Sequence, residues 1–385
     1  MKDTPNGERV RISFFGRRNV GKSSLVNAIT GQNLSIVSEY AGTTTDLVQK
    51  AMELLPLGPV LLTDTAGLDD EGELGKLRIE KTLSILPKTD IAVIVSDGEW
   101  GALEKGLIQK CMQLEIPFYC VDNKADLITN ADSDKIRVSA RTGEGIAKLK
   151  QILAQTRKPE KRQLAGDLVS PYDIVILVTP IDESAPKGRL ILPQQQVIRD
   201  LLDARACCVV VQGREYGEIL KKIPEPRLVI TDSQIFGEVA AQTPPAIPLT
   251  SFSILIARYK GFLPAAMRGI TALRSLKDGD TVLIAEGCTH HRQCNDIGSV
   301  QLPRKIREYT KKNLNFQFCS GGEYPDLTGI SLIMHCGGCM LSEREMLLRM
   351  QTAEIKNIPF TNYGIFLSEY SGILERATEL FRRKA

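Results

Sequence analysis

The sequence predicts an α/β protein of three domains, with an N-terminal P-loop domain followed by two smaller Rossmann-like units. Short apolar runs of strand length alternate with amphipathic segments of helix length, a pattern typical of parallel sheets covered by helices. A glycine-rich loop follows the first of these runs. The length of 385 residues is large for one hydrophobic core, because domains usually contain about 100–200 residues. We expect the domains at residues 1–165, 166–268 and 269–385.

The composition indicates a soluble, intracellular protein. Hydrophobic residues make up 43% of the chain and charged residues 25%, which is ordinary for a globular protein. The net charge of +3, without a long basic block, argues against a nucleic-acid partner. The 9 scattered cysteines suggest a reducing cytosol, and neither a signal peptide nor a membrane-length apolar run is visible. We therefore expect a cytoplasmic protein with no nucleic-acid or membrane partner.

The first strand, Val10–Phe15, runs directly into a Gly-x4-Gly-Lys-Ser loop and then a helix. The glycines allow backbone N–H groups to face phosphate oxygens, and the helix N-terminus adds its positive end. Lys22 is expected to reach the β- and γ-phosphates, and the Ser23 hydroxyl to ligate Mg²⁺. The predicted nucleotide-binding residues of this loop are Gly16, Asn19, Val20, Gly21, Lys22, Ser23 and Ser24.

Later motifs at the ends of predicted strands complete the pattern of a GTP-binding domain. The strand Val60–Thr63 leads to Asp64, which can hold Mg²⁺ through water, and to Gly67, which can sense the γ-phosphate. Another buried strand is expected at Ile91–Ser96.

The strand Phe118–Val121 leads to Asn123, Lys124 and Asp126. The Asp126 carboxylate can accept two hydrogen bonds from guanine, a donor pair that adenine lacks. Ser139 and Ala140 follow Val138 and place a backbone N–H at the guanine O6. Motifs in this order at strand ends predict a GTPase that uses GTP and Mg²⁺.

This first segment resembles the TrmE–Era–EngA group of GTPases. The resemblance implies that Asn19 ligates potassium, and that Thr44, in Ala41–Asp46, binds Mg²⁺ together with Ser23 and Asp64. Leu68 replaces the water-orienting glutamine of Ras-like enzymes, so hydrolysis should be slow without K⁺ or a partner.

The middle unit follows a charged, proline-containing linker at 155–163 and alternates strands with helices. The strands are expected at Ile174–Val178, Cys207–Val211 and Leu228–Thr231. Cys207 and Cys208 are expected to be buried as small hydrophobic residues. No catalytic group is evident, and this unit is a candidate oligomerisation module. The proline-rich segment 243–248 suggests a boundary or a long connection.

In the third unit, Cys288, Cys319 and Cys336 each follow a predicted strand, and Cys339 lies one turn after Cys336. The carboxyl ends of parallel strands meet at one edge of a sheet, so these residues can converge. All 3 histidines of the chain fall in the same two loops: His290, His291 and His335. The pattern predicts a metal site.

The residues alone leave the metal open. Three cysteines and a histidine can form a tetrahedral zinc site, or they can hold an iron–sulfur cluster with an open iron position. Gly337 and Gly338 suit a bulky cluster, because their backbone can approach it. A redox dithiol formed by Cys336 and Cys339 is a further alternative.

The chain as a whole resembles the maturation GTPases of the FeFe-hydrogenase active-site cluster, the HydF family. The resemblance rests on a GTPase domain fused to Cys288-Thr289-His290 and His335-Cys336-Gly337-Gly338-Cys339. It implies a 4Fe–4S cluster on Cys288, Cys336 and Cys339, with an exchangeable fourth position near His290 and His335. Cys294 and Cys319 lie outside the family pattern, and we expect them in the core rather than at the pocket.

The same resemblance implies a scaffold and carrier. It would receive a di-iron precursor from radical-SAM maturases and deliver it to apo FeFe-hydrogenase, and the middle unit would form a homodimer or a higher homo-oligomer. Two alternatives are an RNA-linked GTPase of the TrmE or Era kind with a structural zinc site, and a redox-regulated GTPase.

Overall fold

The computed structural model describes residues 6–31, 48–69, 72–127, 134–156, 162–180, 190–287, 297–321 and 325–382. These fall into two compact units, Met1–Glu160 and Lys161–Ala385. In the described parts of the chain, no helix is both long and apolar enough to cross a membrane. The mixed α/β architecture that the sequence predicts is confirmed.

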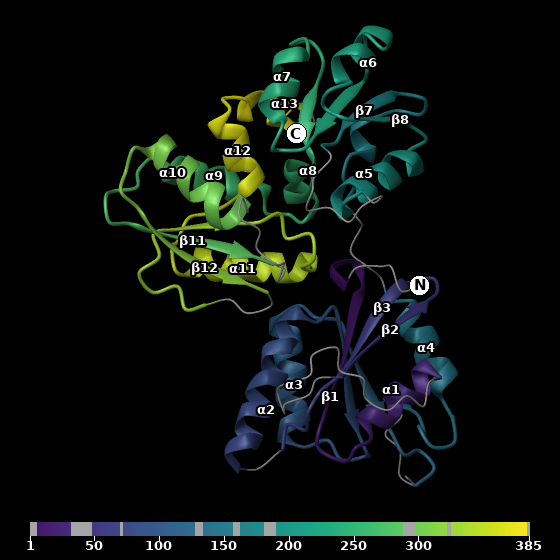
Figure 1. The fold of residues 1–385 in the computed structure, drawn as a ribbon. Coiled ribbons are helices and arrows are strands. Elements are labelled where there is room, and N and C mark those ends of the chain that lie inside the picture. Colours follow the sequence, from purple (N-terminus) through teal and green to yellow (C-terminus); the bar gives the residue numbers. More distant parts are fainter. Residues whose placement is uncertain are drawn as a thin grey trace. The chain divides into compact units, whose positions relative to one another are not determined.

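The first unit contains a six-stranded sheet of order β2-β3-β1-β4-β5-β6, parallel except for the β2–β3 pair. The strands are β1 Val10–Phe15, β2 Val48–Leu54, β3 Gly58–Asp64, β4 Ile91–Ser96, β5 Phe118–Asp122 and β6 Ile136–Arg137. The helices are α1 Lys22–Thr30, α2 Gly72–Ile85, α3 Ala102–Gln113 and α4 Ile146–Ala154. Figure 1 shows α1 and α4 on one face of this sheet and α2 and α3 on the other.

The alternation of side chains along β1 builds a core on both faces of the sheet. Phe14 packs with Leu25 of α1 and Leu149 of α4. Phe15, the next residue, packs on the opposite face with Leu107 of α3. Burial on both faces explains why these strands are nearly continuous apolar runs.

The second unit contains two four-stranded parallel sheets, of order β10-β9-β7-β8 and β12-β11-β13-β14. The strands are β7 Ile174–Val178, β8 Cys207–Val211, β9 Leu228–Thr231, β10 Leu249–Ser251, β11 Thr281–Glu286, β12 Asn315–Ser320, β13 Leu332–His335 and β14 Phe360–Asn362. The helices are α5 Leu192–Asp203, α6 Tyr216–Lys222, α7 Phe236–Gln242, α8 Phe252–Tyr259, α9 Leu263–Leu273, α10 Leu302–Thr310, α11 Glu343–Ile355, α12 Tyr363–Tyr370 and α13 Leu374–Arg382.

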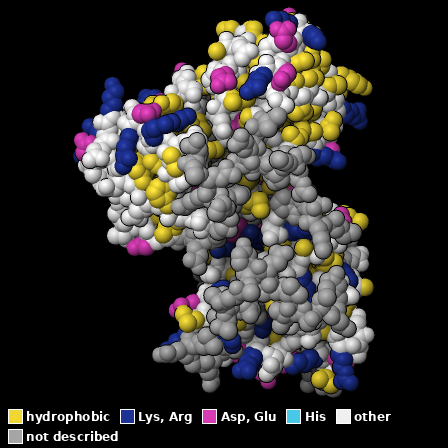
Figure 2. All heavy atoms as spheres, in the orientation of Figure 1, with side chains coloured by type: hydrophobic (Ala, Val, Ile, Leu, Met, Phe, Trp, Pro, Cys, Tyr) yellow, Lys and Arg dark blue, Asp and Glu magenta, His cyan; other side chains and the backbone are white. Residues whose placement is uncertain are grey.

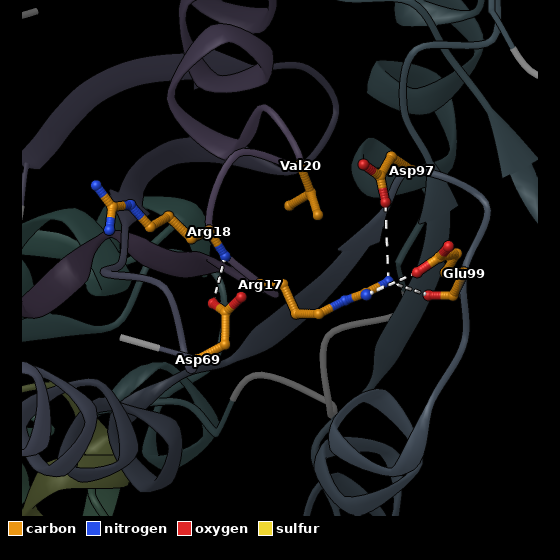
Figure 3. Close-up of a pocket in the computed structure, with 6 residues that line it drawn as sticks. All are labelled: Arg17, Arg18, Val20, Asp69, Asp97 and Glu99. Carbon is orange, nitrogen blue, oxygen red and sulfur yellow. Dashed lines mark hydrogen bonds and ion pairs between the residues drawn. The ribbon is translucent and has the colours of Figure 1, made fainter. Parts of the chain in front are cut away.

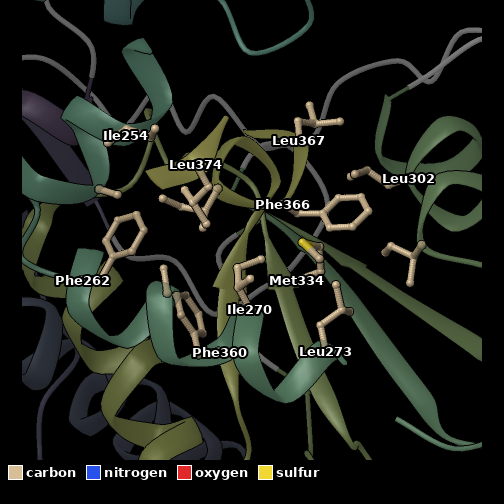
Figure 4. Packing of buried hydrophobic residues seen from close by; sticks show 14 of the residues in the cluster. Ile254, Phe262, Ile270, Leu273, Leu302, Met334, Phe360, Phe366, Leu367 and Leu374 are labelled. Carbon is tan, nitrogen blue, oxygen red and sulfur yellow. The ribbon is translucent and has the colours of Figure 1, made fainter. Parts of the chain in front are cut away.

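One hydrophobic core joins the two sheets of this unit. It extends from Ile176 in β7 through Phe262 beside α9 to Met334 in β13 and Phe366 in α12. Figure 4 shows Phe262, which directly precedes α9, near Phe360 of the second sheet, and Ile270 of α9 between Phe360 and Met334. Because this core is shared, the two sheets form one unit.

Three details bear on these expectations. The segment 243–248 is a connection between α7 and β10 and not a boundary, since β10 pairs with β9 of the same sheet. The prediction that Cys207 and Cys208 are buried is wrong, because β8 lies at the sheet edge, where Cys207 is exposed and Cys208 half-buried. The expected domain limit at 268/269 falls inside α9, and we now propose a limit before Leu263.

Candidate nucleotide and metal sites

Two glycines fix the shape of the loop between β1 and α1. Gly16 has φ +150, and a Cβ there would lie 2.2 Å from the carbonyl oxygen of Val95. Gly21 has φ +89, and a Cβ there would lie 2.3 Å from Nδ2 of Asn123. No larger residue fits either position, so the backbone itself lines this loop.

Lys22 begins α1 and is buried, with 7% of its surface exposed. Its Nζ donates to the carbonyl oxygens of Gly16, at 3.1 Å, and Arg17, at 2.7 Å. Ser23 and Ser24 follow in the first turn and are exposed. A cation and hydroxyl groups therefore stand together at a helix N-terminus, which suits an anionic phosphate chain.

Asp64, at the end of β3, fits a magnesium site. Among the described residues, its Oδ1 is a buried oxygen without a hydrogen-bond partner. Burial raises the pKa of Asp64, while a hydrogen bond from Ser23 and the charges of Lys22 and Lys50 oppose the rise. A buried carboxylate oxygen that lacks a donor and lies beside a serine hydroxyl is suited to hold a hard divalent cation or its water.

The predicted guanine-binding residues lie together after β5 and β6. Asn123 donates from Nδ2 to the Val20 carbonyl, at 2.9 Å, and its Oδ1 accepts from the Ala140 N–H, at 3.1 Å. Asp126 is exposed and accepts from the Ser139 hydroxyl at 2.7 Å, a hydrogen bond that lowers the pKa of Asp126. The Asp126 carboxylate is thus held ionised and open to solvent, as recognition of guanine requires.

The segment after β3 is docked on the P-loop. A Cβ at Gly67 would lie 2.9 Å from the backbone nitrogen of Arg18. The Arg18 N–H donates to Asp69 Oδ1 at 2.5 Å, and the Leu68 N–H donates to the Gly16 carbonyl at 3.3 Å.

Leu68 is 9% exposed and packs with Phe15 and Ile94, so its side chain belongs to the core. Asn19 has φ +60 and an exposed side chain. Thr44, the predicted third magnesium ligand, lies outside the described residues.

Arg17 forms a charge network that the sequence did not reveal. Its guanidinium donates to Glu104 at 2.9 Å and to Glu99 at 3.0 Å, and it lies 3.8 Å from Asp97. Asp97 also accepts from Lys124 at 3.0 Å. Figure 3 shows the Arg17 side chain directed toward Asp97 and Glu99 across a polar pocket. Through Asp97, this network connects the phosphate loop to the guanine loop.

Cys336 lies directly after β13, between β11 and β14. Its N–H donates to the Ala285 carbonyl at 2.8 Å, which continues the ladder to β11. Its Sγ accepts from the Gly287 N–H, at 3.1 Å, and from the Gly338 N–H, at 3.3 Å. Backbone donors of this kind favour a thiolate over a thiol.

Burial of the thiol group is the main influence on the pKa of Cys336. Although the residue is only half-buried overall, burial of the thiol raises its pKa to about 11, and the hydrogen bonds from Gly287 and Gly338 oppose the rise. A metal ion must displace the thiol proton, and the N–H groups already stand where the resulting charge would develop.

Gly338 is the glycine that the cysteine loop requires. It has φ +64, and a Cβ there would lie 2.3 Å from Sδ of Met346. Gly337 has open space at the same position. Cys339 follows and is half-buried.

His335 is fully buried at the end of β13. Its Nδ1 lies 2.8 Å from the Cys336 carbonyl, and its Nε2 lies 2.9 Å from a guanidinium nitrogen of Arg349. Because a carbonyl accepts and a guanidinium donates, the ring is neutral with its proton on Nδ1, and burial together with Arg349 lowers its pKa to about 3. Both ring nitrogens are therefore engaged in this conformation.

Cys288, His290, His291 and Cys294 lie outside the described residues. Within the described ranges, no group of three or more His, Cys, Asp or Glu side chains could hold a metal ion. Cys319 is half-buried in β12, and burial raises its pKa. The Cys336 and Cys339 thiols, with two N–H groups directed at the Cys336 sulfur, fit a thiolate-bound group.

Comparison with known families separates the chain into three segments. Residues 164–261 match the hydrogen maturase F dimerization domain, and residues 264–380 match the hydrogen maturase F tetramerization domain. Together these two models cover more than half of the chain. The chain belongs to the hydrogen maturase F family. Residues 11–124 match a family of GTPases described as 50S ribosome-binding.

Curated relatives share only part of their length with this chain. The tRNA modification GTPase MnmE of Endomicrobium trichonymphae is 35% identical over 154 residues, 36% of this chain and 34% of the relative. MnmE of Synechococcus sp. (strain JA-3-3Ab) is 36% identical over 159 residues, 38% of this chain and 33% of the relative. The match thus spans about a third of the length of these relatives.

Solved structures of GTPases match this chain only with TM-scores below 0.5. Era of Aquifex aeolicus bound to GDP·AlF4⁻ is 20% identical, with 55% of this chain and 97% of that chain covered and a TM-score of 0.33. The G domain of the T. maritima FeoB iron transporter is 24% identical, with 37% and 96% covered and a TM-score of 0.31.

The family assignment makes the chain a member of the hydrogenase maturases that carry a GTPase domain. The GTPase domain implies GTP and Mg²⁺ as ligands. The matches to a dimerization and a tetramerization domain support a homo-oligomer.

Proposed function

We propose that this protein is a GTP-hydrolysing scaffold and carrier in the maturation of the FeFe-hydrogenase active site. In this proposal it binds a 4Fe–4S cluster, receives a di-iron precursor from radical-SAM maturases and delivers it to the apo-hydrogenase in the cytoplasm. The family assignment supports maturation. The observation that carries the metal site is the hydrogen bond from the Gly287 N–H to Cys336 Sγ, because Cys288 is the next residue along the chain.

The proposed cluster ligands are Cys288, Cys336 and Cys339. A cluster with three cysteine ligands supplies one exchangeable iron position, at which cargo can be held and released. We assign His290 to that position, because both ring nitrogens of His335 already have partners. His335 then positions the cysteine loop, since it ties the Cys336 carbonyl to Arg349.

The residues around the nucleotide site are suited to GTP hydrolysis. Lys22 would balance the phosphate charge, Ser23 and Asp64 with Thr44 would hold Mg²⁺, and Asp126 would select guanine. Gly67 would sense the γ-phosphate. Leu68 is packed in the core and has no hydrogen-bonding group for an attacking water, so we expect slow turnover.

We also propose that Asn19 ligates potassium beside the nucleotide. Its side chain is exposed on the phosphate loop, where it can reach a hydrated cation. Replacing K⁺ by Na⁺ should lower GTP turnover in the parent protein and have little effect in Asn19→Ala. Equal rates in the two salts for the parent protein would exclude this role.

The function is tested by activation of apo FeFe-hydrogenase. The protein is incubated anaerobically with the radical-SAM maturases, re-purified and added to apo-hydrogenase, and hydrogen evolution is measured. We expect activation with the parent protein and with Cys207→Ala, and none with Cys336→Ala. Full activation by Cys336→Ala, or none by the parent protein, would contradict the proposal.

The RNA-linked alternative has less support. The tRNA modification GTPases cover less than two fifths of this chain, whereas residues 164–380 match hydrogen maturase F domains. It would be favoured by stoichiometric zinc together with salt-sensitive RNA binding.

A further inference from the structure

Lys260, a buried lysine just after α8, holds the loop that contains Cys336 and Cys339. Lys260 follows α8 directly and is 4% exposed. Its Nζ donates to the carbonyl oxygen of Gly338, between the two cysteines, and to that of Leu341, at 2.7 Å. Lys260 lies in the segment that matches the dimerization domain, and its acceptors lie in the segment that matches the tetramerization domain.

The burial of this ammonium group calls for a compensating charge. Transfer of an ammonium ion from water to a protein interior costs several kcal/mol unless an anion or several dipoles surround it. These two hydrogen bonds of Lys260 go to neutral main-chain carbonyls. Glu345 and Glu343, at the start of α11, act on Lys260 less strongly than the cysteines, and Glu345 accepts from the Ser342 N–H and caps that helix.

The cysteines are the other electrostatic neighbours of Lys260. Burial lowers the pKa of Lys260 to about 8, and the thiols of Cys339 and Cys336 are the largest influences that oppose this change. Gly338, whose carbonyl accepts from Lys260, is the residue directly before Cys339, and its own N–H donates to Cys336 Sγ. Metal binding is the event that converts such cysteines to thiolates.

We propose that Lys260 is a positioning residue for the thiolate-bound metal group: it fixes the 336–341 loop and supplies the positive charge that balances the bound thiolates. This inference rests on the proposed metal site. It also gives the dimerization segment a direct contact with the cysteine loop, so the two matched segments are coupled at this point. A lysine that merely fastened the loop would act through its hydrogen bonds, and its charge would be irrelevant.

The test compares the reduction potential of the reconstituted iron–sulfur centre in four proteins. Lys260→Gln keeps an N–H donor and removes the charge, whereas Lys260→Arg keeps the charge. Lys277→Met is the matched control, because Lys277 is exposed and precedes the opposite, amino-terminal end of β11. Each full-length protein is reconstituted anaerobically with iron and sulfide and titrated by EPR, with iron content and thermal unfolding measured in parallel.

We expect a more negative potential in Lys260→Gln, because loss of a nearby positive charge disfavours the reduced, more negative centre. Lys260→Arg and Lys277→Met should remain near the parent value. If Lys260→Gln folds but does not load, restored loading in Lys260→Arg supports the role of charge and continued failure overturns it. Lys260→Met provides the same comparison should Lys260→Gln unfold.

A Lys260→Gln centre with the parent potential would overturn the inference and leave the proposed metal site intact. Failure of the parent protein to form any iron–sulfur centre would instead refute the proposed function. The two failures are therefore distinguishable in one experiment.

Discussion

At the residue scale, the two glycines between the cysteines are not equivalent. Gly338 has positive φ and faces Met346 Sδ, whereas the same position at Gly337 is open. We expect Gly338→Ala to cost about 3 kcal/mol, because left-handed backbone and overpacking each contribute about 1–3 kcal/mol. It should also lower the iron bound after reconstitution, since a shift of this backbone would move the residue 338 N–H away from Cys336 Sγ.

Gly337→Ala is the matched control, expected to stay within about 0.5 kcal/mol of the parent. Thermal unfolding and iron analysis of the two variants check this prediction. Equal effects at the two positions would show that the turn is not constrained as described.

Asp126 is the residue on which base specificity should depend. An Asn at this position replaces one of two acceptors by a donor, which suits xanthine, whose O2 accepts where the guanine amino group donates. Because hydrogen bonds to charged groups contribute about 1.5–3 kcal/mol each, Asp126→Asn should weaken GTP binding at least about 100-fold. Binding of fluorescent GTP and XTP analogues measures the change, and unaltered GTP affinity would exclude Asp126 from the base site.

Substitutions of His290 and His335 should have different effects, because the two histidines are assigned different roles. Gln at position 335 retains a hydrogen-bond acceptor for Arg349, so His335→Gln should load iron with an unchanged EPR spectrum and a lower unfolding temperature. His290→Gln should instead change the spectrum, because that residue is assigned to the exchangeable position. The opposite pattern would exchange the two roles.

The roles of single residues were only partly accessible from the sequence. The spacing of Cys336 and Cys339 and the motifs around Lys22 and Asp126 are local, and local patterns can be read. The engagement of His335 depends on Arg349 from α11, and Lys260 reaches the loop from 78 positions away. Contacts across such separations leave no periodic signal in one sequence.

At the element scale, β8 is an edge strand with an apolar surface. Val210 is 43% exposed, and the neighbouring Ile174, Leu202 and Tyr172 are exposed as well. Figure 2 shows hydrophobic side chains gathered over the β7–β8 side of this sheet. An unprotected edge of this kind favours pairing with another chain, and the segment matches a dimerization domain.

We therefore expect Val210→Lys to weaken self-association, because a charged side chain blocks edge pairing. The dissociation constant should rise by about tenfold or more, which corresponds to about 1.4 kcal/mol. Sedimentation velocity measures it, with Met112→Lys on α3, another exposed apolar position, as the control. An unchanged mass distribution for Val210→Lys would place the interface elsewhere.

Most strands were predictable because burial on both faces makes them continuous apolar runs. The β8 strand shows the limit of this reasoning, since Cys207–Val211 is as apolar as a central strand although it lies at the edge. The short strand β10 was missed because only three residues, Leu249–Ser251, follow a proline-rich segment. An apolar run indicates a surface that is covered, but it does not say whether the same chain covers it.

At the scale of the whole molecule, the second unit brings the oligomerisation segments and the cysteine loop into one body. The helix α13 returns to the first sheet, where Arg376 donates to the carbonyls of Thr243 and Pro244. Lys260, which follows α8, likewise joins its segment to the cysteine loop. Assembly of copies and loading of the proposed metal site would therefore involve the same folded body.

We propose above all that Cys288, Cys336 and Cys339 hold an iron–sulfur cluster on a GTPase scaffold. The most direct measurement is iron, acid-labile sulfide and zinc per chain in anaerobically purified and reconstituted protein, for the parent, Cys336→Ser, Cys339→Ser and the control Cys207→Ala. We predict about four iron and four sulfide per chain in the parent and the control, and a clear loss in both other variants. Stoichiometric zinc without sulfide, or undiminished iron in Cys336→Ser and Cys339→Ser, would contradict this proposal.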